Sequence, residues 1–211
     1  MDTFASEAGY RIAFVLILLG SMTASATYRL RARREAGVIP RRDEGAGLIL
    51  ARLLLGLPLA AALLAYAIQP DWLAWAQLDL PTWLRLSGIV VGASLIPALV
   101  WMFRSIGSNI SETVLTRREQ RLVTHGPYRW VRHPLYTLAS LLILSLGLIS
   151  ASGFLLVFGV VVWVAVALVV IPREEANLLA AFGGEYQDYM SRTGRFLPRL
   201  VGTGPQNGPG D

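Results

Sequence analysis

The chain contains no cysteine and no lysine, and few of its residues carry a charge. The lack of cysteine excludes a disulfide-stabilised fold, and it excludes zinc or iron–sulfur sites with thiolate ligands. Only 16% of the 211 residues are charged, whereas about 25% is usual for a soluble domain. AVILMFWYC residues make up 54% of the chain, which is too apolar for a disordered protein. The length suits one domain, but the composition does not suit an ordinary soluble one.

Five long apolar stretches predict an all-α, polytopic membrane protein. A helix needs about 20 mostly apolar residues to cross the hydrocarbon core of a bilayer. The second, third and fifth stretches meet that length, the first is marginal and the fourth is short. Only Ala151 and Ser152 separate the last two stretches, so we expect a tight helical hairpin there. The expected spans cover residues 12–28, 48–68, 84–103, 135–150 and 153–172.

The first stretch has one alternative interpretation, a secretory signal peptide, because Ala24-Ser25-Ala26 resembles a cleavage site. Asp2 and Glu7 precede this stretch, however, and a run of arginines follows it. That order is the reverse of the charge pattern of a signal peptide. We therefore expect a retained membrane span.

The positions of the arginines predict the orientation of the five spans. Sixteen of the 19 arginines lie after the first span, after the third span or in the tail: Arg29, Arg31, Arg33, Arg34, Arg41, Arg42, Arg104, Arg117, Arg118, Arg121, Arg129, Arg132, Arg173, Arg192, Arg195 and Arg199. These segments share one side of a five-span chain, and the positive-inside rule places that side in the cytoplasm. The N-terminus is then outside and the C-terminus is cytoplasmic. The net charge of +5 is explained by this distribution, so we expect no nucleic-acid partner.

The opposite side of the membrane carries Trp72, Trp75 and Trp83, which suit interfacial anchors. Residues 1–201 are expected to form one domain. Residues 202–211 are rich in glycine and proline and predict a disordered tail.

Polar residues concentrate in two cytoplasmic segments, 104–134 and 172–199, which predicts a site at the cytoplasmic membrane face. In the first segment Gly126-Pro127 predicts a turn, and Pro134 suits the first turn of a helix. Backbone N–H groups at that helix start can bind a carboxylate or a phosphate, beside the positive charge of Arg132 and His133. The alternative is that the Arg-His pair only caps a membrane helix by reaching toward water.

The second segment opens with Glu174 and Glu175 two residues after Pro172, a pattern that suits a helix N-terminus. The pair is either a solvated helix start or a carboxylate site for ribose hydroxyls or a ligand ammonium group. Gly183-Gly184 predicts a break, and Phe196-Leu197-Pro198 predicts the end of this helical region. Apolar residues on one helical face predict an amphipathic segment on the membrane or over the site, namely Leu178, Leu179, Phe182, Tyr186 and Tyr189.

Together the two segments resemble the isoprenylcysteine carboxyl methyltransferase family and its phospholipid methyltransferase relatives. The resemblance covers about residues 105–199. The matching motifs are Leu122-Val123, Gly126-Pro127-Tyr128, Arg132-His133-Pro134-Leu135-Tyr136, Glu174-Glu175, Phe182-Gly183, Glu185-Tyr186 and Arg195-Phe196-Leu197-Pro198. Two positions depart from the family pattern: Leu138 stands where a glycine is frequent, and Val170 stands where eukaryotic members have a substrate-binding arginine.

The resemblance implies S-adenosylmethionine as methyl donor and a lipophilic acceptor, preferably a carboxylate. Arg132 or Arg173 would orient that carboxylate through bidentate hydrogen bonds. The resemblance implies no metal. By family analogy the donor contacts fall on Thr113, Gln120, Arg121, Leu122, Val123, Tyr128, His133, Pro134, Leu135, Tyr136 and Glu174. The compact, arginine-only chain suits a prokaryotic inner membrane with its site facing the cytoplasm.

Two other functions remain open on the sequence. An NADPH-dependent membrane reductase of the sterol and steroid type carries a similar Arg-His-Pro-x-Tyr run, but Glu174-Glu175 followed by Phe182-Gly183 favours the methyltransferase. A non-enzymatic membrane protein, such as a small transporter, is the other alternative. Transporters usually hold ionisable groups at mid-membrane, and the expected spans contain almost none.

Overall fold

The computed structural model describes residues 6–36, 46–107 and 121–199. Its regular elements over those ranges are all helical, apart from two isolated β-bridges, so the all-α class is confirmed. The helices run in the order α1 (Glu7–Ala36), α2 (Ala46–Ile68), a 3-10 helix (Pro70–Ala76), α3 (Thr82–Ile106), a 3-10 turn (Gly126–Arg129), α4 (Pro134–Ser150), α5 (Gly153–Ala165), a π-helical turn (Val166–Val170), α6 (Ile171–Phe182) and α7 (Gly184–Arg192).

Four helical segments in the described ranges are long and apolar enough to cross a bilayer: Glu7–Glu35, Ile49–Ile68, Thr82–Ile106 and Gly153–Phe182. The fourth expected span is α4, which is apolar but has only 17 residues. At 1.5 Å per residue it extends over about 25 Å, less than the hydrocarbon thickness of about 30 Å. The chain is thus a membrane protein with four candidate spans in the described ranges, and the span expected at α4 stays a prediction.

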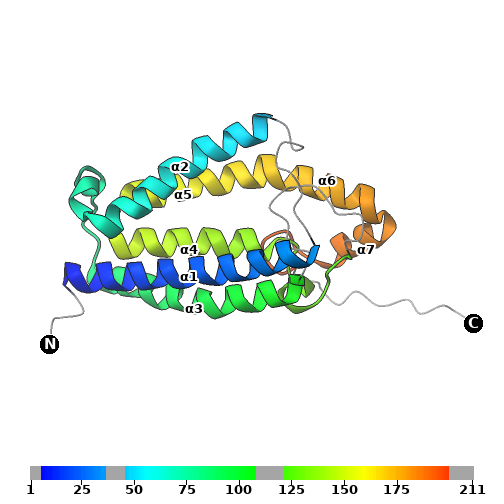
Figure 1. The fold of residues 1–211 in the computed structure, drawn as a ribbon, viewed down its shortest axis with the longest axis horizontal. Coiled ribbons are helices and arrows are strands. Elements are labelled where there is room, and N and C mark those ends of the chain that lie inside the picture. The colour runs from blue at the N-terminus through cyan, green and yellow to red at the C-terminus, as the bar shows by residue number, and fades with distance from the viewer. Residues whose placement is uncertain (1–5, 37–45, 108–120, 200–211) are drawn as a thin grey trace, which may run out of the picture.

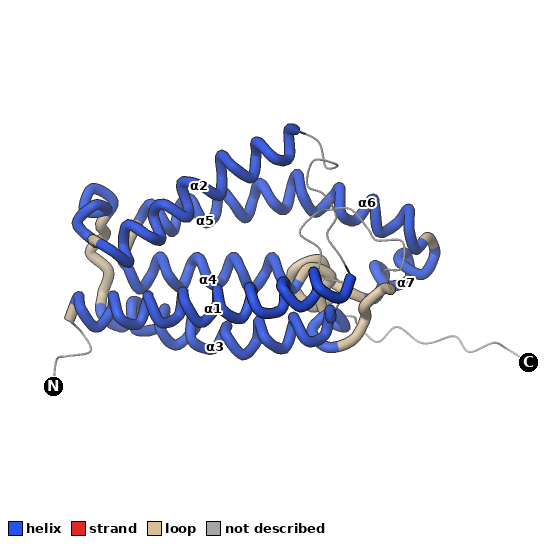
Figure 2. Tube along the Cα trace, in the orientation of Figure 1, coloured by secondary structure: helices blue, strands red, loops and turns tan. Residues whose placement is uncertain are grey.

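The long helices run roughly parallel, with α1, α3 and α4 grouped together and α2 and α5 beside each other (Figure 1; Figure 2 shows the same trace coloured by secondary structure). One apolar cluster fills the end near the N-terminus and includes Tyr10, Phe14, Tyr66, Leu146 and Ile149. A second fills the end near α7 and includes Ala32, Leu99, Met102, Phe103 and Tyr128. The rest of the helical surface is strongly apolar and exposed, as in Leu54, Leu57 and Val90, which suits contact with lipid.

Glycines on α3 allow that helix to lie very close to its neighbours. A Cβ atom at Gly88 would approach the Ser145 carbonyl oxygen of α4 to 2.9 Å, and one at Gly92 would approach the Ile17 Cδ1 of α1 to 3.1 Å. These positions are four residues apart, so they lie on one helical face, the small-residue pattern of packed membrane helices. The three helices therefore form a tight group whose ends are fixed relative to one another.

A buried arginine connects α1, α3 and α4 at the end of the group near the N-terminus. Arg85 of α3 forms an ion pair with Glu7 of α1, and its guanidinium carbon lies 3.7 Å from the centre of the Tyr10 ring. Its Nε donates a hydrogen bond to the Ile149 carbonyl oxygen of α4 at 3.0 Å. One side chain thus connects all three helices at the end opposite to α7.

The sequence signals for turns are confirmed. Ala151 and Ser152 form the tight connection between α4 and α5, with Ala151 in the left-handed region and Ser152 capping α5. Helix α6 ends at Phe182, Gly183 adopts a positive φ of 55°, and α7 begins at Gly184.

The expected boundary near residue 172 differs from the structure. Helix α5 continues through the π-helical turn into α6, so that Gly153–Phe182 is one helix of 30 residues. Proline inside an α-helix usually breaks it because it lacks an N–H group and clashes with the preceding turn. Here the wider π turn at Val166–Val170 directly precedes Pro172 and lets the helix continue. The acidic pair therefore extends from the last membrane helix instead of starting a new one.

Candidate active site

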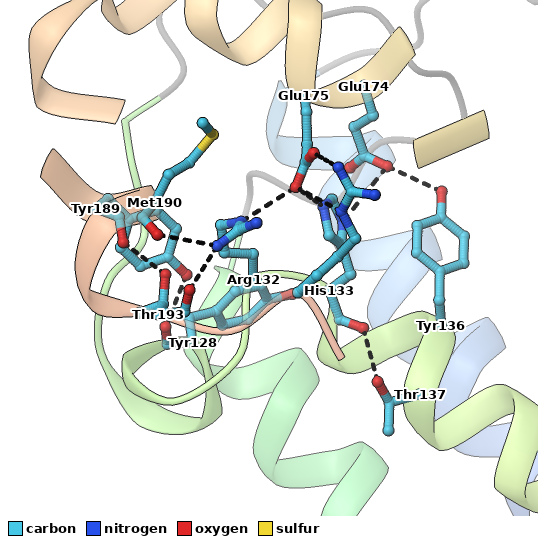
Figure 3. A network of polar contacts seen from close by, with 11 residues as sticks. Tyr128, Arg132, His133, Tyr136, Thr137, Glu174, Glu175, Tyr189, Met190 and Thr193 are labelled. Atoms are coloured by element: carbon cyan, nitrogen blue, oxygen red, sulfur yellow. Dashed lines mark hydrogen bonds and ion pairs between the residues drawn. The ribbon is translucent and has the colours of Figure 1, made fainter. Parts of the chain in front are cut away.

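A polar network occupies the end of the molecule where α4 begins and where α6 and α7 meet (Figures 1 and 3). Its side chains come from three segments that are far apart in sequence: Arg132, His133 and Tyr136 at the start of α4, Glu174 and Glu175 on α6, and the stretch 189–195.

Backbone pairing holds the C-terminal segment beside the residues that precede α4. The N–H groups of Arg132 and His133 donate to the carbonyl oxygens of Gly194 and Arg195 at 2.9 and 3.2 Å, and the Gly194 N–H donates to the Trp130 carbonyl oxygen at 3.1 Å. Gly194 is required here, because a Cβ atom would collide with the Leu197 carbonyl oxygen. This short parallel pairing fixes the position of Arg195 and Phe196 relative to His133.

The predicted Gly126-Pro127 turn forms the 3-10 turn that supports this segment. Gly126 has a φ of 61°, and a Cβ atom there would collide with the Ser105 side chain at the end of α3, so only glycine fits. Tyr128 is buried behind the turn, and its carbonyl oxygen accepts a hydrogen bond of 2.7 Å from the Tyr189 hydroxyl. Burial raises the pKa of Tyr189 to about 12 and also raises the pKa of Tyr128. Both tyrosines therefore stay protonated at neutral pH.

Glu175 is the centre of the network. Its Oε1 accepts from Arg132 Nε at 3.1 Å and lies 3.2 Å from His133 Nε2, while Arg195 contacts both carboxylate oxygens. The glutamate side chain is only 10% exposed. Two guanidinium groups against one buried carboxylate favour its ionised form, so Glu175 is a fixed anion that binds the three segments together.

The guanidinium group of Arg132 hydrogen-bonds to several acceptors in this network. Beside Glu175, its Nη1 donates to the carbonyl oxygens of Met190 at 3.2 Å and Thr193 at 2.5 Å. Its side chain is 11% exposed. The guanidinium thus holds the end of α7 against α6 in this structure.

Glu174 has different surroundings from its neighbour. Its Oε2 accepts a hydrogen bond from the Tyr136 hydroxyl at 3.0 Å and lies 3.9 Å from His133 Nδ1, which is too long for a hydrogen bond. The Glu174 side chain retains 30% exposure. The protein therefore positions the Glu174 carboxylate and still leaves it accessible to a ligand. Figure 3 shows Glu174 at the edge of the network beside Tyr136.

His133 lies between the two glutamates, with one ring nitrogen toward each. The residue is 4% exposed and sits at the N-cap position of α4. Its ring also packs against Tyr136 and Phe196, with centroid distances of 5.9 and 6.4 Å, and Phe196 contacts Trp163 of α5. These rings form an apolar wall next to the exposed carboxylate.

The structure brings some of the sequence-predicted residues together and separates others. His133, Pro134, Leu135, Tyr136 and Glu174 lie at one place, with Arg132 directly beside them. Tyr128 is buried behind the site, and Val123 packs against the same apolar cluster as Tyr128. Leu122 is partly buried and Arg121 is exposed at the start of that segment.

Other predicted residues lie apart. Arg173 is exposed on α6, one residue before the acidic pair. Thr113 and Gln120 lie outside the described residues. No group of three or more metal-binding side chains occurs in residues 6–36, 46–107 and 121–199.

Sequence reasoning missed the central position of Glu175 and the contribution of Arg195 and Thr193. The sequence shows Glu175 as one member of an acidic pair. The direction in which its side chain points depends on the π turn, which rotates the following residues around the helix axis. Arg195 lies within the motif Arg195-Phe196-Leu197-Pro198 that carried the resemblance, which was the one available signal for it.

Comparisons with known proteins find relatives that are similar to part of the chain. Residues 84–185 match the family model described as phospholipid methyltransferase. The protein-S-isoprenylcysteine O-methyltransferase of Mus musculus is 31% identical over 140 residues, which is 61% of this chain and 46% of the relative. The cobalt-zinc-cadmium resistance protein CzcN of Cupriavidus metallidurans is 41% identical over 86 residues, 40% of this chain and 38% of the relative. The matches thus span less than half the length of these two relatives.

A solved structure shares the fold. The structure of the eukaryotic intramembrane Ras methyltransferase, isoprenylcysteine carboxyl methyltransferase, superimposes with a TM-score of 0.51 and 20% sequence identity, over 88% of this chain and 67% of the other. The matched family region includes the start of α4 and the acidic pair of α6. Residues 84–185 are thus similar to the phospholipid methyltransferase family, and the chain shares the fold of an isoprenylcysteine carboxyl methyltransferase.

Proposed function

We propose that this protein transfers a methyl group from S-adenosylmethionine to a lipophilic acceptor, preferably a carboxylate, at the cytoplasmic face of a membrane. The observation that carries the proposal is the accessible Glu174 carboxylate beside the first turn of α4. The match of residues 84–185 to the phospholipid methyltransferase family model and the similarity to an isoprenylcysteine O-methyltransferase support methyl transfer as the reaction.

The residues present suit the chemistry of this donor, which carries an ammonium group, a carboxylate and ribose hydroxyls. Glu174 accepts hydrogen bonds from hydroxyl or ammonium donors. The N–H groups of Leu135 and Tyr136 lie in the first turn of α4, where they have no acceptor within the helix, so they suit a ligand carboxylate. We assign donor contacts to Glu174, Tyr136 and the start of α4.

When bound, S-adenosylmethionine supplies an electrophilic methyl group on a sulfonium. An acceptor carboxylate or thiolate is already a nucleophile, so the protein has no need of a strong base. Its contribution is to hold the acceptor in line with the methyl group, and such positioning is worth about 7–11 kcal/mol. The ring wall of His133, Tyr136 and Phe196 keeps water from the reacting atoms, and the Glu175 network keeps that wall in place.

The charge distribution supports the cytoplasmic orientation. Arg31, Arg33, Arg34 and Arg104 lie at the site end of α1 and α3, whereas the exposed Trp72, Trp75 and Trp83 lie at the opposite end. Under the positive-inside rule the site end faces the cytoplasm. A prokaryotic inner membrane suits this arrangement, and a lipophilic acceptor would enter from the bilayer.

The test is calorimetric titration of the detergent-purified full chain with S-adenosylhomocysteine, with NADPH titrated in parallel. We expect micromolar binding of S-adenosylhomocysteine and no binding of NADPH. Binding of NADPH alone would assign the start of α4 to a reductase and overturn the proposal. Binding of neither compound would leave the non-enzymatic alternative and would also overturn it.

A further inference from the structure

The ends of α1 and α3 nearest to the candidate active site lie next to each other and carry arginines placed against aromatic rings (Figure 1). Tyr28 of α1 stacks on Phe103 of α3, with ring centroids 5.6 Å apart. Two exposed arginines contact this tyrosine. Arg104 donates from Nε to its hydroxyl at 3.0 Å, and the guanidinium carbon of Arg31 lies 5.7 Å from its ring centre. Tyr28 thus holds two positive charges near each other at the surface.

A second pair of rings continues this surface along α3. Trp101 precedes Arg104 by three residues, a spacing that puts both on one side of the helix, and both are exposed. Trp101 contacts Trp130 edge-on at a centroid distance of 5.7 Å. Arg129 lies over the Trp130 ring, with its guanidinium carbon 4.1 Å from the ring centre. The Arg–Trp patch consists of Tyr28, Arg31, Trp101, Arg104, Arg129 and Trp130.

The three arginines of this patch differ from the paired arginines elsewhere in the molecule. Arg85, Arg132 and Arg195 each form an ion pair with a glutamate. Within residues 6–36, 46–107 and 121–199, the arginines of the patch have rings or a hydroxyl as partners and no carboxylate. Arg104 uses only Nε toward Tyr28, so its two terminal nitrogens remain as donors for a ligand. The patch therefore concentrates positive charge that the described residues do not neutralise.

The patch lies where two apolar helices become polar. Trp101 and Arg104 belong to the last two turns of α3, and Tyr28 and Arg31 follow the apolar stretch of α1. Both helices are candidate membrane spans. Tryptophan and tyrosine at such a boundary usually lie at the level of the lipid headgroups. The nearest anions at that level are lipid phosphates.

We propose that the Arg–Trp patch binds the headgroup of an anionic phospholipid in the leaflet at the site end of the molecule. Arginine suits a phosphate because it donates two parallel hydrogen bonds, and basic clusters beside membrane helices bind anionic headgroups. The ammonium group of a zwitterionic lipid brings a further positive charge next to three arginines. Arg129 also occupies a face of the Trp130 ring, the surface that a quaternary ammonium group needs. The patch thus favours anionic over zwitterionic lipids.

The bound lipid contacts a segment that supports the candidate active site. The Trp130 carbonyl oxygen accepts a hydrogen bond of 3.1 Å from the Gly194 N–H, which is part of the pairing beside His133. Tyr128, in the turn that precedes Trp130, packs in one cluster with Phe103. A ligand that binds the folded protein and not the unfolded chain raises stability. Anionic lipid should therefore raise the unfolding temperature.

The experiment compares wild type with Arg31→Gln, Arg104→Gln, Arg129→Gln and the triple variant, each as the detergent-purified full chain. Arg192→Gln is the matched control, because Arg192 is an exposed arginine of α7 that donates to a backbone carbonyl oxygen. Native mass spectrometry counts bound phosphatidylglycerol and phosphatidylcholine of equal chain length over a range of lipid concentrations. The unfolding temperature is measured with each lipid.

We expect wild type to bind phosphatidylglycerol about tenfold more tightly than phosphatidylcholine, because each arginine near the headgroups favours the anionic lipid. Each single Gln variant should lose about fivefold in affinity for phosphatidylglycerol, and the triple variant should bind both lipids equally. Arg104→Lys should lose part of the affinity, since lysine keeps the charge but not the two parallel hydrogen bonds. Arg192→Gln should behave as wild type. Phosphatidylglycerol should stabilise wild type and leave the triple variant unchanged.

Several outcomes would overturn the proposal. These are equal affinity of wild type for the two lipids, an unchanged preference in the Gln variants, and an equal loss in Arg192→Gln. Displacement of the lipid by millimolar inorganic phosphate would assign the patch to a free anion and would also overturn it. The single variants keep the test decisive if the triple variant fails to fold. Lipid binding is measured without a methyl donor, so the result does not depend on the proposed methyl transfer.

Discussion

Adjacent glutamates on α6 have opposite tasks because successive helical residues point about 100° apart. Glu175 is enclosed by Arg132, His133 and Arg195. Among the residues that the structure describes, Glu174 has a hydrogen-bond partner only in Tyr136, and its side chain keeps 30% exposure. A buried anion with several donors organises its surroundings, and a half-open one is available to a ligand. The two side chains can therefore be separated by mutation.

Glu174→Gln keeps the shape of the side chain and removes its charge. A hydrogen bond to a charged group contributes about 1.5–3 kcal/mol, so the affinity for S-adenosylhomocysteine should fall by about 10- to 100-fold with the fold intact. Titration calorimetry measures the change. The control is Glu185→Gln, an exposed glutamate on α7. Wild-type affinity in a folded Glu174→Gln protein would show that this carboxylate does not contact the donor.

Glu175→Ala should instead destabilise the protein. Removing one partner of a buried ion pair costs about 3–5 kcal/mol because the other charge stays buried and unpaired. Arg195→Gln should cost about 1 kcal/mol or less, since the Arg195 side chain is 44% exposed. Unfolding in mixed micelles of increasing SDS content compares the two. A smaller loss for Glu175→Ala than for Arg195→Gln would contradict the central position of Glu175.

At the scale of elements, the C-terminal segment completes the site through backbone pairing with residues 130–133. Gly194 is the point where this pairing is most crowded. A change there should act on both stability and ligand binding, because it moves Arg195 and Phe196 away from His133.

Gly194→Ala should lower the free energy of unfolding by about 1–3 kcal/mol, the usual cost of overpacking, and should weaken S-adenosylhomocysteine binding in parallel. Gly184→Ala is the matched control, because a Cβ atom there meets nothing within 4 Å. Alanine in the first turn of α7 should be neutral or slightly stabilising. Equal behaviour of the two variants would show that the pairing does not support the site.

Local signals account for the elements that the sequence predicted. The two-residue link at Ala151-Ser152, the break at Gly183-Gly184 and the first-turn position of Pro134 all depend on residues close in sequence, and all are confirmed. Pro172 led to the prediction of a new helix start, whereas the helix continues through it. The π turn that accommodates this proline has no simple sequence signature.

Long-range contacts account for what the sequence did not predict at the site. The motifs indicated His133, Tyr136 and Glu174, which the structure brings together. The pairing of residues 194–195 with residues 130–133 leaves no periodic pattern.

At the scale of the whole molecule, the two ends of the helical group differ in chemistry, and the absence of cysteine allows a direct test of orientation. Asp188→Cys places a thiol on α7 at the site end, and Asp71→Cys places one in the 3-10 helix at the opposite end; both positions are exposed. In right-side-out bacterial cells, a membrane-impermeant maleimide should label only the Asp71→Cys protein. Labelling of the Asp188→Cys protein in intact cells would reverse the proposed orientation.

Because the helix from Gly153 to Phe182 is continuous, we expect the position of the site to depend on bilayer thickness. At 1.5 Å per residue its 30 residues extend over about 45 Å, about 15 Å more than the hydrocarbon layer. Both glutamates lie in the C-terminal half of this helix, in the α6 part that contains the site. A long helix responds to a thinner bilayer by tilting, and the 17-residue α4 has no such excess length. We therefore expect lipids of different chain length with the same headgroup to shift Glu174 relative to Tyr136, and the proposed methyl transfer in such vesicles should change with helix tilt.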